Sequence, residues 1–82
     1  MKIAVAPEAI GAARDVLYLL RLLSNIPTCS QVMFDNDALR ILSQVRTHLA
    51  AKRHLTEENN VNIAATISNI TKNAANVITM SI

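Results

Sequence analysis

A short apolar run passes directly into a polar cluster near the middle of this 82-residue chain. Residues 30–34 are β-prone and mostly apolar, and Asp35, Asn36 and Asp37 follow at once. An apolar run of this length that is bounded by turn residues is typical of a buried strand. Because ligands gather where the strands of an α/β sheet end, we expect a binding site of this chain to include Asn36.

The remaining pattern predicts a strand-helix-strand-helix-helix order. Residues 2–6 form another short apolar run, which ends at Pro7, a residue suited to the first turn of a helix. Apolar residues at helical spacing predict three helices, over residues 8–23, 37–52 and 57–73. With strands at 2–6 and 30–34, this order favours a right-handed crossover between parallel strands. The predicted fold is a helix-rich, partial α/β doubly wound parallel sheet.

The predicted sheet is too small to be self-sufficient. Two parallel strands leave both outer edges exposed and cannot cover three largely apolar helices. The apolar content is 51%, almost all of it aliphatic, while aromatic residues are 2%, which argues against a base-stacking surface. We therefore expect either dimerisation or an internal piece of a larger domain, and we favour the piece.

Several classes of protein are disfavoured by composition. No run of eighteen uncharged apolar residues is present, which argues against a transmembrane helix, and Pro7 and Glu8 interrupt the first apolar run, which makes a poor secretion signal. The one cysteine, Cys29, cannot form an internal disulfide and favours a reducing compartment, so we expect a cytoplasmic protein. The net charge of +2 is modest, and acidic residues bracket the basic ones, so a solvated helix face is favoured over a nucleic-acid partner.

The sequence offers no metal site and no catalytic residue. Cys29, His48 and His54 lack the spacing of zinc ligands. The two histidines are six residues apart, a spacing that does not place them on one helical face, and no nucleophile and base can be assigned around them.

Three segments together resemble the tubulin and FtsZ superfamily of GTP-binding filament proteins. Residues 3–7 resemble the family's strand that ends in proline, and residues 7–14 are similar to the FtsZ pattern of Pro, an acidic residue, Gly and Arg, although one residue short. Residues 34–39, Phe-Asp-Asn-Asp-Ala-Leu, are close to the tubulin pattern Asp-Asn-Glu-Ala-Leu. Residues 60–71 are similar to the start of the long central helix of tubulins, which opens on an asparagine.

The resemblance implies a guanine nucleotide site. Asn36 and Asn60 correspond to the family's two asparagines that bind guanine, and Arg14 and Glu8 would lie near the ribose or the base. An amide offers a donor and an acceptor together, which suits the mixed edge of guanine. The simpler alternative for Asn36 is a helix cap, and for Asn60 it is the chemistry of a helix start.

The chain also departs from the family. A phosphate loop needs several glycines, and this chain has one; the catalytic loop is not recognisable at residues 73–76. The resemblance therefore implies GTP as cofactor, GTPase activity and like subunits in a filament only for a parent protein. This chain alone would contribute the guanine and ribose contacts without being an enzyme.

The alternative hypothesis is a small helical interaction protein. Its aliphatic helix faces would form a homodimer, and it would bind no nucleotide. Neither hypothesis involves nucleic acid or a membrane.

Overall fold

A computed structural model describes the backbone of residues 7–81 and the side chains of residues 13–77. It contains four helices, α1 (Pro7–Ser24), α2 (Pro27–Asp35), α3 (Ala38–Ala51) and α4 (Glu57–Ser81). No strand occurs within residues 7–81. The predicted α/β doubly wound sheet is therefore wrong, and the observed fold is all-helical.

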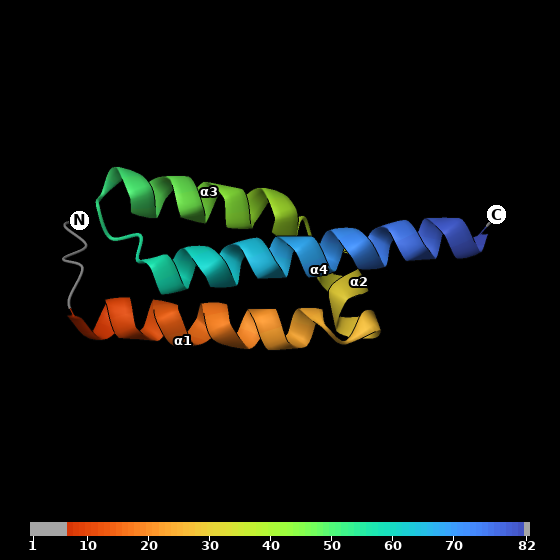
Figure 1. The fold of residues 1–82 in the computed structure, drawn as a ribbon, viewed down its shortest axis with the longest axis horizontal. Coiled ribbons are helices and arrows are strands. Elements are labelled where there is room, and N and C mark those ends of the chain that lie inside the picture. The colour runs from red at the N-terminus through yellow and green to blue at the C-terminus, as the bar shows by residue number, and fades with distance from the viewer. Residues whose placement is uncertain (1–6, 82) are drawn as a thin grey trace.

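Helix α4 is the central element of the molecule (Figure 1). Helix α1 runs beside it in the same direction, α3 runs antiparallel along its other side, and α2 lies across one end. Helices α1, α2 and α3 all pack on α4, whereas the backbones of α1 and α3 do not approach each other closely. The result is an elongated, open arrangement of 49 × 21 × 19 Å rather than a closed bundle.

The predicted strand at residues 30–34 lies within α2. Pro27 occupies the first turn of α2, where its missing N–H costs nothing. Ser30 is fully buried and Met33 packs against the core, so the inward side chains are three apart, as on a helix. Packing on α4 thus outweighs the β propensity of this short run. The other predicted strand, residues 2–6, lies outside the described residues.

Local signals place the start of α4, but not its end. The Thr56 hydroxyl accepts a hydrogen bond from the backbone N–H of Asn59 at 3.0 Å, which is N-cap chemistry. The helix continues to Ser81, beyond the predicted end at residue 73. Ala74 is buried, and the side-chain amide of Asn73 donates to the Pro27 carbonyl at 3.3 Å. These tertiary contacts stabilise the helical conformation of a segment whose composition is typical of a turn.

The core is built on one face of α4. Ile63 and Ile70 are fully buried there, together with Leu17 of α1 and Leu42 of α3. Partly buried apolar side chains from all four helices complete the cluster, among them Leu20, Met33, Leu39, Val45 and Ile67. The core therefore depends on α4 as the shared partner of the other three helices.

Asparagines of α4 align it with α1 and α2. Asn62 accepts a hydrogen bond from Arg21 at 3.2 Å, and the amide of Asn69 donates to the Ser24 hydroxyl at 3.0 Å. Asn73 extends this row to the start of α2. Aliphatic packing alone tolerates a shift along the helix axis, whereas these polar pairs are satisfied in one register, as with buried polar residues in coiled coils.

The residue that follows the C-cap of α3 has left-handed backbone geometry. Arg53 has φ 58°, its N–H donates to Ala50 at 3.1 Å, and the N–H of His54 donates to Leu49 at 2.8 Å. These two bonds form a Schellman motif, in which glycine is the preferred residue at the left-handed position.

Replacing Arg53 by glycine is expected to raise the free energy of unfolding by about 0.5–1 kcal/mol. The change removes the Cβ clash of the left-handed conformation, and the greater freedom of glycine in the unfolded chain offsets part of the gain. Urea denaturation measures the difference. Lys52→Gly is the control, because Lys52 has φ −87° and gains no such relief; a loss of stability in Arg53→Gly would contradict the prediction.

Candidate functional site

The two asparagines predicted to bind guanine lie in different surroundings. Asn36 is the C-cap of α2, and its side-chain amide donates to the Val32 carbonyl at 2.7 Å, so it serves as a helix cap. Asn60 lies in the first turn of α4 with its side chain exposed. Its neighbour Asn59 points inward instead and is 1% exposed. The cavity that Asn36 lines does not include Asn60.

The other two predicted site residues do not complete a nucleotide pocket. Arg14 of α1 is exposed and lies 3.6 Å from the Asp15 carboxylate, in a solvent-exposed pair that contributes little to stability. Glu8 lies in the first turns of α1, and its side chain is outside the described residues. Because residues 7–81 also form no sheet edge, the crevice that the GTP hypothesis required is not found in them. The resemblance to tubulin and FtsZ stays a prediction that this geometry does not support.

An apolar groove lies between α1 and α3. The backbones of these two helices stay apart, and residues of α2 and α4 line the space between them. A cavity of about 270 Å³ lies there, lined by Leu20, Val32, Met33, Asn36, Ala38, Ile41, Leu42 and Thr66. A neighbouring hollow of about 350 Å³ shares Val32 and Met33 and adds Leu23, Thr28 and Cys29. We call these two hollows together the apolar groove.

The apolar groove and the adjoining flank of α1 expose large aliphatic side chains. Val32 is 60% exposed and Ile41 46% exposed at the rim of the groove. Val16 and Leu19 lie one helical turn before Leu20 and Leu23 on α1, and both are more than half exposed. No charged residue lines the groove. A continuous exposed apolar surface of this kind marks an interaction site.

The prediction from sequence missed this groove for an identifiable reason. Residues 30–34 were assigned to the interior of a sheet, which leaves no role for an exposed Val32. One signal did point to the groove: Val16, Leu19 and Leu22 widen the apolar face of α1 beyond the stripe that one partner helix covers. The structure shows that this additional width is uncovered.

The described part of the chain has no group of three or more potential metal ligands. None of its helices has the length and hydropathy needed to cross a membrane. Comparison with protein-family models, with curated proteins and with solved structures finds no match to this chain.

Proposed function

We propose that this chain is a helical interaction module that forms a homodimer through the apolar groove. The observation that carries the proposal is the uncovered aliphatic surface of the groove and of the adjoining flank of α1. The aliphatic side chains of this surface come from α1, α2 and α3. Because α1 and α3 lie on opposite sides of α4, they cannot cover each other's apolar faces within one chain.

The exposed area of the molecule supports association. The chain of 8.9 kDa exposes 5961 Å², whereas a compact monomer of this mass exposes about 4,800 Å². Its radius of gyration is 14.0 Å, compared with about 12 Å for a compact domain of this length. The excess area is larger than the roughly 800 Å² that each partner buries in an interface of standard size. A dimer would therefore bring the exposed area close to that of ordinary proteins.

A second copy of the chain fits the chemistry of the groove. Its lining carries no charge, so two copies meet without burying an unpaired ionic group. Each copy also supplies a projecting apolar ridge, Val16 and Leu19, beside its own groove. In a two-fold dimer the ridge of one copy packs into the groove of the other, and the contact is repeated by symmetry.

We also propose that the dimer functions in the cytoplasm. The chain has one cysteine, and Cys29 is a free thiol that lines the groove, which suits a reducing compartment.

Sedimentation equilibrium tests the proposal on the purified chain. We expect a reversible transition from 8.9 kDa to twice that mass as concentration rises. Labelling of Cys29 by a maleimide should slow over the same concentration range, because the dimer covers this thiol. A chain that remains monomeric at millimolar concentration, or that associates without stopping at two copies, would overturn the proposal.

A further inference from the structure

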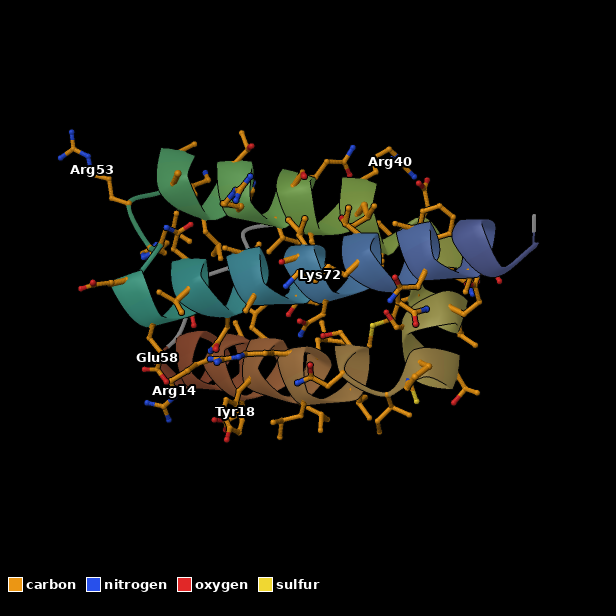
Figure 2. All side chains as sticks on the ribbon, turned by 45° about the vertical axis from the view of Figure 1, so that its right-hand side comes forward. Arg14, Tyr18, Arg40, Arg53, Glu58 and Lys72 are labelled. Atoms are coloured by element: carbon orange, nitrogen blue, oxygen red, sulfur yellow. The ribbon has the colours of Figure 1, made fainter. Side chains whose placement is uncertain are left out.

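A second cleft lies on another flank of α1, where this helix passes the first turns of α4. It has a volume of about 420 Å³ and is lined by Tyr18, Arg21, Glu57, Glu58, Val61 and Asn62. It shares no residue with the apolar groove and differs from it in having three charged residues in its lining. Figure 2 shows Tyr18 and Glu58 projecting near this end of the α1–α4 pair.

The inner wall of this polar cleft contains an unsatisfied hydrogen-bond donor. Asn62 is 2% exposed, and its side-chain oxygen accepts a hydrogen bond from Arg21 at 3.2 Å. Its side-chain nitrogen, Nδ2, is buried and has no partner. This nitrogen exposes less than 1 Å², so a ligand in the cleft would meet Arg21 rather than Nδ2.

Arg21 adds a positive charge next to this amide. Its guanidinium has five N–H donors, and the hydrogen bond to Asn62 uses one of them. Within the described residues no carboxylate lies within 4.0 Å of Arg21, since the ion pairs there are Arg14–Asp15 and Arg40–Asp37. A guanidinium presents several N–H donors in one plane, which suits a carboxylate that accepts hydrogen bonds through both of its oxygens.

The acidic side chains of the cleft suit a ligand with an opposite charge at its other end. Glu57 and Glu58 line the cleft, and neither forms an ion pair with a described residue. An ammonium group would be attracted to these carboxylates while a carboxylate is held by Arg21. Tyr18 and Val61 are about half exposed and offer apolar contact to the rest of the ligand.

We propose that this polar cleft binds a free α-amino acid with an aliphatic side chain. Its carboxylate accepts hydrogen bonds from Arg21, and its ammonium group lies beside Glu57 and Glu58. A residue inside a peptide carries neither charge, so the same arrangement selects a free amino acid. The inference is independent of the proposed dimer, because the two sites share no residue.

Amide chemical shifts of the ¹⁵N-labelled chain, titrated with leucine, test the proposal. We expect saturable shifts at residues that line the cleft, such as Tyr18 and Val61. N-acetyl-leucine lacks the ammonium group and leucinamide lacks the carboxylate, so each should bind at least about tenfold more weakly than leucine. No saturable shift at the cleft, or equal affinity for the three compounds, would overturn the proposal.

Two variants test whether the charged side chains of the cleft contribute to leucine binding. Arg21→Met should weaken leucine binding at least about tenfold, whereas Arg40→Met, the same change on α3 outside the cleft, should leave it unchanged. Since Arg21 also aligns α1 with α4, Glu58→Gln provides a second probe at an exposed position. A folded Glu58→Gln chain, judged by its circular dichroism, should also lose about tenfold in affinity. Unchanged binding in both cleft variants would contradict the assignment.

Discussion

Replacing Ile70 by alanine is expected to lower the free energy of unfolding by about 3–4 kcal/mol. Ile70 is fully buried on α4, in the core cluster that also contains Leu17 of α1 and Leu42 of α3. The substitution removes three carbon atoms and leaves a cavity. The surrounding helices cannot all move inward to fill it, so part of the cavity remains. A loss of this size is a large part of the total stability of a domain of this length.

Urea denaturation at one fixed protein concentration measures this effect, because dimerisation makes apparent stability depend on concentration. The control is Val61→Ala on the same helix, where the side chain is 50% exposed and the expected change is within about 0.5 kcal/mol. A loss below about 1 kcal/mol for Ile70→Ala would show that this side chain is not in a packed core.

Replacing Val32 by aspartate is expected to raise the dissociation constant of the proposed dimer at least about a hundredfold. Val32 lines both hollows of the apolar groove, and its 60% exposure means that the isolated chain tolerates a charge there. In a two-fold dimer the change places a carboxylate in the groove of each copy, where it loses water and gains no cation.

The matched control for this experiment is Val61→Asp. Val61 is 50% exposed and lines the polar cleft instead of the groove, so the same substitution there should leave dimerisation intact. Sedimentation equilibrium gives the dissociation constants of both variants, and circular dichroism shows whether each remains helical. Equal dimerisation by Val32→Asp and the unchanged chain would exclude the apolar groove as the interface.

The sequence predicts those parts of the fold that are determined by residues within the same segment. The starts of α1 and α4 follow from Pro7 and Thr56, and α3 follows from an apolar repeat at helical spacing. No signal of comparable strength within the α2 segment itself predicts a helix there. Residues 30–34 are too few to distinguish a strand from a buried helix by periodicity, and contact with α4 decides the outcome.

The candidate sites were harder to predict, because contacts between distant segments create them. Arg21 and Asn62 are 41 residues apart, and no local pattern indicates that they meet. The apolar groove exists because the backbones of α1 and α3 stay apart, which is a property of the whole arrangement. Asn36 was chosen for guanine recognition, yet it lies in the wall of this groove as a helix cap.

The central position of α4 also affects how the chain acquires its structure during synthesis. The helix that the other three need as a common support is the last of the four to be made. Until it emerges, the apolar sides of α1 and α3 have little to pack against and remain open to chaperones or to other nascent chains. Docking of α1 on α4 must then close a loop of more than forty residues, which favours late folding over stepwise growth from the N-terminus.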